Sequence, residues 1–369
     1  MSRAVSNIES SISDLDFQDR ILPHVSRTFA LTIPLLPGRL RCAVSNAYLS
    51  CRIADTIEDE LPLASDDTLA YLRQFADALA GRRDPERLGR EIAARLPEGT
   101  LQGERQLVRN MARVVRVTCA LDDRAREAIR HCVDVMCEGM HRFQCRTSLR
   151  GLDRMSDLDT YCYYVAGVVG EMLTELFCGY SSEIDVHQAE LSALARSFGQ
   201  GLQMTNILKD QWEDRQRGVC WLPRDVFGSH GVELARLRPG RADNRFCAAL
   251  DELIGIAHGY LRDALAFTLL IPPEEKGIRG FCLWAIGLAV LTLRRIHENP
   301  WFASGADVKV SHGEVFLVRA LTRMAGRNDA MLVRLFETAA EGLPLVRSDR
   351  SGSAALTGES GVLHLDDWL

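Results

Sequence analysis

The sequence predicts an all-α protein. Apolar residues recur at a spacing near 3.6 along most of the chain, strand-like alternation is nearly absent, and the breaks between apolar segments fall at Pro and Gly. We expect helices at residues 42–58, 104–120, 124–145, 157–180, 188–214, 246–270, 277–298, 313–325 and 328–342. The chain is therefore expected to be a string of medium to long helices.

The expected helix ends coincide with residues that interrupt helices. They fall at Leu61-Pro62, Gly81 to Pro85, Pro97 to Gly99, Leu222-Pro223 and Pro272-Pro273. No Pro-, Gly- or Ser-rich stretch divides the middle of the chain, so we expect one domain over residues 1–346. Residues 347–369 are rich in Ser, Gly and acids, and we expect a loosely held tail there.

Composition and charge exclude some classes of protein. With 369 residues, 47% of them hydrophobic and 25% charged, the chain can bury a large core. The net charge of −6 gives no basic surface of the kind that nucleic acids require, so no nucleic-acid partner is expected. Nothing in the composition implies an obligate protein partner.

Cysteine usage and hydropathy bear on the location of the chain. Eleven cysteines without a CxxC pair, and a polar N-terminus without an apolar signal segment, indicate a reducing, cytoplasmic setting. The longest apolar run, Gly280 to Leu293, is shorter than the roughly 20 residues that cross a bilayer. We therefore expect no membrane-spanning segment.

Two acidic groups lie far apart in the chain. Asp55 and Asp59 belong to the string DTIED, and Asp210 and Asp214 belong to DQWED. The i, i+4 spacing puts both aspartates of a group on one helix face, where like charges repel by about 0.2–0.5 kcal/mol. Two such faces turned toward each other would form a pocket of hard oxygen ligands that suits Mg²⁺, or Mn²⁺, completed by water and substrate phosphates. The pattern predicts a helical protein that handles a diphosphate.

Other oxygen ligands flank these aspartates. Asn206 precedes Asp210 by one helical turn, Glu213 follows Asp210 by three residues, and Glu58 follows Asp55 by three. The first acidic group is therefore Asp55, Glu58 and Asp59, and the second is Asn206, Asp210, Glu213 and Asp214. Taken alone, each group could be a solvated helix face on which acids only keep the surface charged. The occurrence of two such groups favours a metal site.

Four segments stand in order along the first 225 residues. They are SRTFA at Ser26 to Ala30, AYLSCRIADTIEDE at Ala47 to Glu60, YCYYVAGVVGEML at Tyr161 to Leu173, and GLQMTNILKDQWEDRQRGVCWLP at Gly201 to Pro223. In content and order they resemble the signatures of the squalene and phytoene synthases. The resemblance implies a single-domain, all-α class I isoprenoid synthase bundle with a central cavity. It also implies the head-to-head condensation of two prenyl diphosphates, with farnesyl diphosphate as the expected substrate.

Basic side chains lie beside the acidic groups. Metal ions would leave part of the phosphate charge uncompensated, and three basic residues lie where they could bind it: Arg27, Arg52 and Lys209. Arg52 precedes Asp55 by three residues and lies on the same helix face. The alternative for each is a surface salt bridge, which stabilises a protein little. Within this constellation we favour phosphate contact.

The segment around Tyr161 is rich in aromatic and small residues. Glycines within a helix, here Gly167 and Gly170, indicate close approach of another helix or of a ligand such as a prenyl chain. The resemblance implies that Tyr161, with Tyr164 one turn away, assists the carbocation steps. It further implies that a set of residues lines the substrate cavity: Ser26, Phe29, Tyr48, Val165, Val169, Gln203 and Asn206.

The C-terminal third bears on the product. FCLWAIGLAVLTLRRI from Phe281 and VKVSHG from Val308 resemble a region of the squalene synthases that phytoene synthases match poorly. The resemblance favours reduction by NADPH to squalene, with Phe281 and Lys309 on the cofactor side. Phe281 could equally be a core residue of an apolar helix. A protein that releases a C30 hydrocarbon could also touch the inner face of a membrane peripherally.

The chain departs from the family pattern near the expected cofactor. Ser311 and Val219 stand where the family has basic residues, so phosphate binding would use other groups: Arg215, Arg217, Arg294 or Lys309. The chain has no GxGxxG and no P-loop, so any NADPH would bind without a Rossmann unit.

Two alternatives stay open. One is a phytoene, dehydrosqualene or hydroxysqualene synthase that makes no use of NADPH, and product analysis separates it from a squalene synthase. The other is a helical lipid-binding or assembly protein without catalysis, which Mg²⁺-dependent release of pyrophosphate from farnesyl diphosphate would exclude.

Overall fold

The computed structural model describes residues 13–26, 28–61, 65–144, 148–241 and 243–346. The described residues are helical apart from connecting turns, and they contain no β-strand, only one isolated bridge between Leu152 and Pro223. The all-α prediction is confirmed. The chain groups into two compact units, unit 1 being residues 1–145 with 175–182 and unit 2 being 146–174 with 183–369. The single-domain boundaries stay a prediction.

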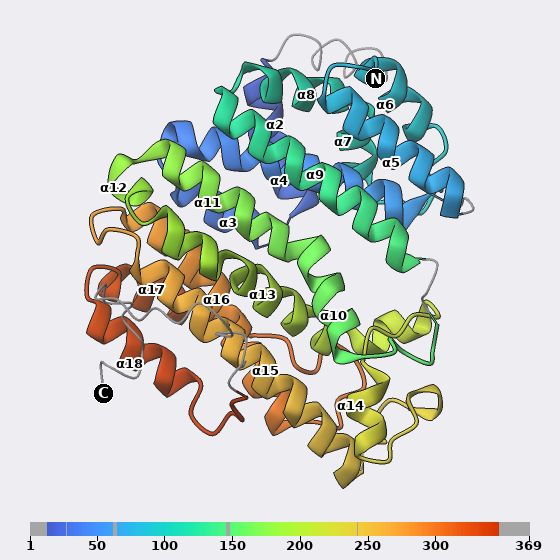
Figure 1. Cartoon of the computed structure of the whole chain (residues 1–369), viewed down its shortest axis with the longest axis vertical. Coiled ribbons are helices and arrows are strands. Elements are labelled where there is room, and N and C mark those ends of the chain that lie inside the picture. Colours follow the sequence, from blue (N-terminus) through green and yellow to red (C-terminus); the bar gives the residue numbers. More distant parts are fainter. Residues whose placement is uncertain (1–12, 27, 62–64, 145–147, 242, 347–369) are drawn as a thin grey trace. The chain divides into compact units, whose positions relative to one another are not determined.

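Unit 1 is a bundle built around a long helix, α4 (Figure 1). Its elements are α2 (Asp14–Val25), α3 (Phe29–Thr32), the 3₁₀ turn η1 (Ile33–Leu35), α4 (Gly38–Glu60), α5 (Ser65–Leu79), α6 (Pro85–Ala93), α7 (Gln102–Arg109), α8 (Met111–Ala120), α9 (Asp123–Gln144) and the last residues of α11 (Val168–Tyr180). Leu49, Ile53 and Ile57 of α4 are fully buried among its neighbours. This packing fixes which side of α4 is left for polar residues.

Unit 2 consists of the remaining elements. They are α10 (Met155–Cys162), the π-helical segment η2 (Tyr163–Gly167), the first residues of α11, α12 (Ser182–Asp185), α13 (Gln188–Gln216), α14 (Arg224–Ser229), the 3₁₀ turn η3 (Leu234–Arg236), α15 (Asn244–Leu269), α16 (Lys276–Glu298), α17 (His312–Ala325) and α18 (Asp329–Ala339). Helices α13, α15 and α16 pack side by side as its core (Figure 1).

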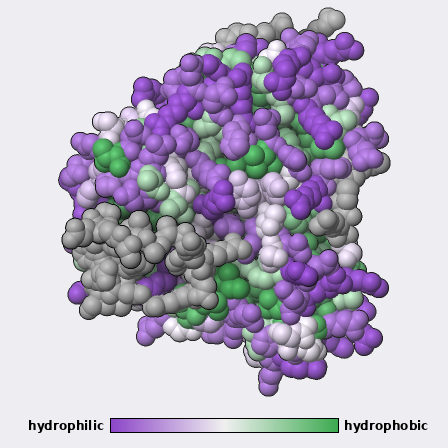
Figure 2. All heavy atoms as spheres, viewed as in Figure 1, coloured by the Kyte–Doolittle hydropathy of each residue, from purple (hydrophilic) through white to green (hydrophobic). Residues whose placement is uncertain are grey.

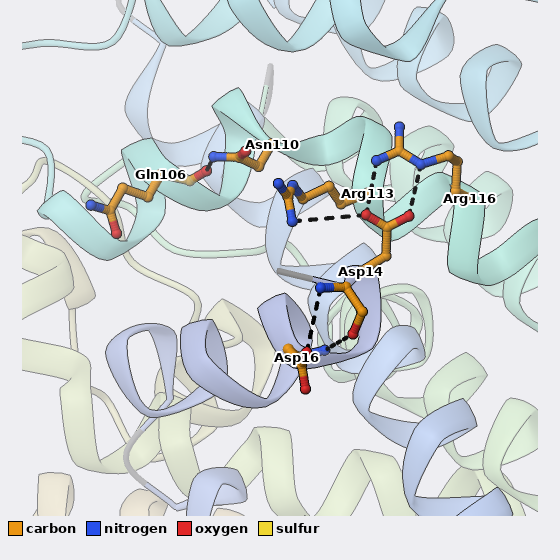
Figure 3. Close-up of polar contacts among 7 residues, drawn as sticks. Asp14, Asp16, Gln106, Asn110, Arg113 and Arg116 are labelled. Carbon is orange, nitrogen blue, oxygen red and sulfur yellow. Dashed lines mark hydrogen bonds and ion pairs between the residues drawn. The ribbon is translucent and has the colours of Figure 1, made fainter. Parts of the chain in front are cut away.

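The expected helices exist, with two differences in continuity. The predicted helix 104–120 is two helices, α7 and α8, because Asn110 leaves the helical conformation (φ −102°, ψ 21°) and its side chain donates to the Gln106 carbonyl, as Figure 3 shows. The predicted helix 157–180 is divided by the π-helical segment η2 between α10 and α11. Periodicity near 3.6 cannot detect either change, because the apolar spacing continues across both.

Several helices were not predicted, namely α2, α3, α5, α6, α12 and α14. Two of them begin with caps that the sequence displays. Ser13 and Asp16 form a capping box that starts α2, and Asp84 accepts from the amides of Glu86 and Arg87 at the start of α6. The stretch Gly81 to Pro85, interpreted as a break, is thus also the start of a helix.

Ion pairs fasten α2 to α8 in unit 1. Asp14 accepts from Arg116 through both carboxylate oxygens, at 2.7 Å from Nε and 2.9 Å from Nη2, and Arg113 lies 3.9 Å away (Figure 3). The hydrogen bonds from Arg116 lower the pKa of Asp14 below its usual value. The segment that follows α2, with Ser26, is thereby held beside the bundle.

Among the described residues, α16 is the one helix long and apolar enough to cross a membrane. Most of it is buried in unit 2. The face of the molecule shown in Figure 2 is mainly hydrophilic, with hydrophobic residues scattered over it. The predicted tail, residues 347–369, lies outside the described residues.

Candidate active site

The first acidic group lies on one face of α4. Tyr48, Arg52, Asp55 and Asp59 follow one another at helical spacing, and Asp59 is exposed. Asp55 and Glu58 are half-buried. The structure thus places the predicted residues of α4 in one continuous row.

Glu104 of α7 anchors Arg52. Its carboxylate oxygen Oε1 accepts from Nη2 of Arg52, while Nη1 of Arg52 lies 3.9 Å from Oδ2 of Asp55. Burial works against the charge on Arg52, but Asp55 and Glu104 outweigh burial and raise the pKa of the guanidinium. Glu104 is only 4% exposed, and sequence analysis missed it. The sequence does show an acidic residue on the apolar side of a predicted helix, and a buried carboxylate needs a charged or hydrogen-bonding partner.

Two groups in this row point to a ligand: a nitrogen of Arg52 that lacks a hydrogen-bond acceptor, and the carboxyl of Asp55, whose pKa is raised. Nε of Arg52 is buried and has no hydrogen-bond partner among the described residues. Burial raises the pKa of Asp55 to about 7, Arg52 opposes the rise, and Asp59 and Glu104 add to it. A cation at the carboxylates would restore the charged form of Asp55, and an anion could accept from Nε of Arg52. Both are features of a site for a metal ion with an anionic ligand.

Three predicted cavity residues meet at the start of this row. The hydroxyl of Ser26 accepts from the Phe29 amide at 3.0 Å, and the rings of Phe29 and Tyr48 lie 5.4 Å apart. Tyr48 donates its hydroxyl to the Val25 carbonyl at 2.9 Å, and burial raises its pKa. Ser26, Phe29 and Tyr48 therefore lie together, whereas the predicted Arg27 lies outside the described residues.

The second acidic group lies on α13. Gln203 is half-buried, Asn206 is exposed, and Asp210 and Asp214 continue the row. Lys209 Nζ lies 3.1 Å from Asp210 Oδ2, so the expected cation does accompany the acids. Asp214 is buried and accepts from Arg217 at 2.5 Å. Asp210 is the more exposed of the two aspartates.

A loop after α16 covers part of the second group. The Gly305 amide donates to Glu213 Oε1 at 2.8 Å, and a Cβ at Gly305 would lie 2.9 Å from Asp210 Oδ1. Asp307 shapes this loop by accepting from the amides of Ala303 and Ser304. Gly305 was not predicted, because its role depends on a contact with α13 that is distant in sequence. Glu213 Oε2 remains buried without a partner in the described part of the chain.

Tyr161 stacks on Trp221. Their ring centroids are 3.9 Å apart and their planes differ by 8°. Trp221 lies just before the Leu222-Pro223 break, and its role was not predicted. The pair brings together two of the segments that the resemblance rests on, YCYYVAGVVGEML and the end of GLQMTNILKDQWEDRQRGVCWLP.

The neighbouring tyrosines differ in their surroundings. Tyr163 donates to Glu171 at 3.3 Å and lies under the guanidinium of Arg196, which is itself paired with Glu171. Tyr164 is half-buried and lies 5.6 Å from the Tyr163 ring. Val165 and Val169 are also half-buried. Tyr163 is thus engaged in unit 2, and it was not among the predicted site residues.

The glycines of this region permit close helix packing. A Cβ at Gly199 would lie 2.0 Å from the Ala166 carbonyl oxygen, and one at Gly170 would lie 2.0 Å from that of Ala195. For Gly170, the predicted approach of another helix is therefore observed, in the form of α13. The π-helical turn η2 lies at this contact, and such turns occur frequently at functional sites.

The residues expected near NADPH differ in burial and in their partners. Phe281 is 3% exposed within the core of unit 2, while Lys309 is exposed. Arg215 donates to the carbonyls of Leu149 and Leu237, and Arg294 pairs with Glu298. A core role for Phe281 is observed, and its contact with a cofactor stays a prediction.

The donor set fits a hard divalent cation. The row on α4 and the row on α13 each offer two aspartates one turn apart, and carboxylate oxygen is the ligand that Mg²⁺ prefers. Within the described residues, no three His, Cys, Asp or Glu side chains gather closely enough to hold a metal ion by themselves. Ions bound here would draw further ligands from water and from a phosphate-bearing substrate.

The chain is similar to known proteins along most of its length. Residues 22–314 match the family model described as squalene/phytoene synthase. Squalene synthase BSS of Botryococcus braunii is 30% identical over 315 residues, which cover 83% of this chain and 64% of that protein. Squalene synthase 1 of Arabidopsis thaliana is 29% identical over 328 residues, covering 87% and 73%. The chain thus spans less than two thirds of the Botryococcus protein.

A solved structure shares the fold. The complex of TcSQS with the ligand BPH1237 superposes with a TM-score of 0.71 at 23% identity, covering 88% of this chain and 90% of that one. At this level of identity, the similarity concerns the helical architecture.

Proposed function

The chain belongs to the squalene/phytoene synthase family, and on that premise we propose that it is a squalene synthase. It would join two farnesyl diphosphates head to head into presqualene diphosphate with release of one diphosphate. Loss of the second diphosphate, rearrangement and hydride transfer from NADPH would then give squalene. The observation that carries the proposal is the presence of both aspartate pairs, on α4 and α13, in a chain about 30% identical to a squalene synthase.

We propose that Mg²⁺ binds at the aspartates of the two acidic groups. Asp55, Asp59, Asp210 and Asp214 would hold the ions, with Glu58, Asn206 and Glu213 beside them. Bound Mg²⁺ would supply Lewis-acid neutralisation of a departing diphosphate. The unpartnered Oε2 of Glu213 and the raised pKa of Asp55 support this assignment, because a nearby cation compensates both.

Arg52 and Lys209 would bind the diphosphate oxygens. Glu104 holds one end of the Arg52 guanidinium, which leaves Nε to donate to the substrate. Lys209 stays beside Asp210 as a compact positive charge. Fixed cations of this kind are oriented before the reaction, so they stabilise the leaving group without reorganising during it.

Tyr161 would stabilise the carbocation with its aromatic face. Trp221 fixes the ring of Tyr161 by stacking, and an aromatic face attracts a cation without reacting with it. Val165 and Val169 would border the prenyl chain and help to exclude water, which otherwise captures the cation. Tyr164, half-buried and 5.6 Å from the Tyr163 ring, is the second aromatic candidate.

NADPH is the proposed reductant. Exposed Lys309 can meet a phosphate, whereas Phe281 is buried and offers little surface to a nicotinamide ring. We assign none of the described residues to hydride transfer.

The test is product analysis with purified protein, farnesyl diphosphate and Mg²⁺, with and without NADPH. Squalene only with NADPH, and presqualene diphosphate without it, would support the proposal. Dehydrosqualene, phytoene or hydroxysqualene regardless of NADPH would replace it with a non-reductive synthase. Asp210→Asn should lower turnover at least about 100-fold. Glu190→Gln, an exposed acid on the same helix, should not.

A further inference from the structure

Helix α17 carries an apolar stripe on its outer side. Phe316 and Met324 are 71% and 74% exposed and stand two turns apart, with Ala320 between them and Leu317, 53% exposed, beside them. Single exposed apolar residues are ordinary on protein surfaces, but a continuous stripe of large ones is not. The stripe is therefore a candidate interaction surface.

The inner side of α17 contacts α16 and α18, and these contacts orient the stripe outward. Val318 lies against Gly287 of α16, where a Cβ would meet its Cγ1 at 3.0 Å, and Ala325 is fully buried. Buried Arg279 donates to the Gly326 carbonyl and to Asp329 at 2.6 Å, which fixes the end of α17 and the start of α18. Packing of unit 2 thus presents the stripe outward.

Two arginines border the stripe. Arg319 and Arg323 are exposed, stand at i, i+4 along one edge, and form no ion pair within the described residues. The Arg319 guanidinium lies 5.8 Å from the Trp284 ring, which holds it at that edge. Two cations one turn apart repel each other, and an anionic surface would remove the repulsion.

We propose that α17 binds the surface of an anionic lipid bilayer. Phe316, Leu317 and Met324 would enter the boundary between headgroups and acyl chains, while Arg319 and Arg323 would bind lipid phosphates. An exposed helix with aromatic and aliphatic residues on one side and arginines beside them has the composition of an interfacial helix. The surface exists whether or not the chain makes squalene, so the inference goes beyond the proposed function.

A second copy of the chain is a poorer occupant. In an antiparallel two-fold pair, the arginine edge of one copy would lie against the same edge of the other. Like charges would then face each other across the contact. A membrane with anionic lipids offers charge of the opposite sign.

The experiment is flotation of the full chain, without substrate, with vesicles of phosphatidylcholine alone or with about one third phosphatidylglycerol. The chain should float only with the anionic vesicles, and added salt should weaken binding. Joint Phe316→Ser and Met324→Ser substitution should reduce binding at least about tenfold, and Arg323→Glu should also reduce it. All these side chains are exposed, so folding is spared.

Matched controls are Val186→Ser, at a residue 75% exposed in unit 2, and Arg236→Glu, at an arginine 83% exposed. Neither should change flotation. No binding to anionic vesicles, or equal loss in the controls, would overturn the proposal. The proposal would also be overturned if the chain does not bind vesicles but forms a dimer that Phe316→Ser dissociates. Binding that requires removal of residues 347–369 would make that segment the occupant and would overturn it as well.

Discussion

Tyr161 and Trp221 form a nearly parallel stack, with centroids 3.9 Å apart, although 60 residues separate them in the sequence. Trp221→Leu should lower kcat up to about tenfold, because an aromatic pair contributes about 0.5–1.5 kcal/mol and the ring of Tyr161 loses its orientation. Steady-state product formation measures the effect. Trp221→Phe should retain most activity, and Trp301→Leu, at a tryptophan 53% exposed, is the control. Full activity of Trp221→Leu would remove Trp221 from the site.

Glu104 should matter for substrate binding through Arg52. Glu104→Gln releases one end of the Arg52 guanidinium, and a small displacement of a binding group can reduce kcat/KM by about 100-fold. Inhibition by inorganic diphosphate should weaken in parallel, which a purely structural role would not produce. Glu86→Gln breaks an exposed Arg–Glu pair in the same unit and should change neither quantity. Unchanged diphosphate inhibition would contradict the role given to Arg52.

Gly199 should not tolerate a side chain. In Gly199→Ala the new Cβ would lie 2.0 Å from the Ala166 carbonyl oxygen, so α13 and η2 must separate. We expect the free energy of unfolding to fall by about 3 kcal/mol in urea titrations. Gly228→Ala places its Cβ in open space and should be neutral or stabilising by about 0.5–1 kcal/mol. Equal stability of the two variants would show that the contact relaxes easily.

The start of α17 should show a defined pH dependence. Burial raises the pKa of Glu314, but hydrogen bonds from Ser311 and Arg295 outweigh burial and lower the pKa to about 2. Because the folded pKa lies below the usual value of 4.5, the stability that these hydrogen bonds contribute is present above that pH and is lost as the pH falls toward 2.

Ser311→Ala removes the cap and should reduce the free energy of unfolding by about 1 kcal/mol at neutral pH. The deficit should shrink as the pH falls below about 4, where Glu314 becomes protonated in the unfolded chain. Urea unfolding over this pH range measures it, and Ser311→Thr should retain the cap. A deficit independent of pH would mean that Glu314 does not take part.

Most of the fold could be predicted, because a helix can be recognised from the spacing of apolar residues along a short segment. The strongly periodic segments became α4, α9, α13, α15 and α16 with small shifts at their ends. Helices α5 and α6 were missed, since Pro and Gly at or near their ends also mark turns. The π-helical turn at Tyr163 to Gly167 could not be predicted, because it adjusts the backbone to a neighbour, α13.

The acidic rows, their basic neighbours and the family were determined by the sequence alone, because they depend on residue type at helical spacing and on ordered motifs. Tertiary structure decided which partner each of three site residues has: Glu104 for Arg52, Gly305 for Glu213, and Trp221 for Tyr161. It also decided that Phe281 is core and that the stripe of α17 faces outward. These outcomes depend on contacts between helices distant in sequence, and such contacts are set by packing, which leaves no periodic signal in the chain.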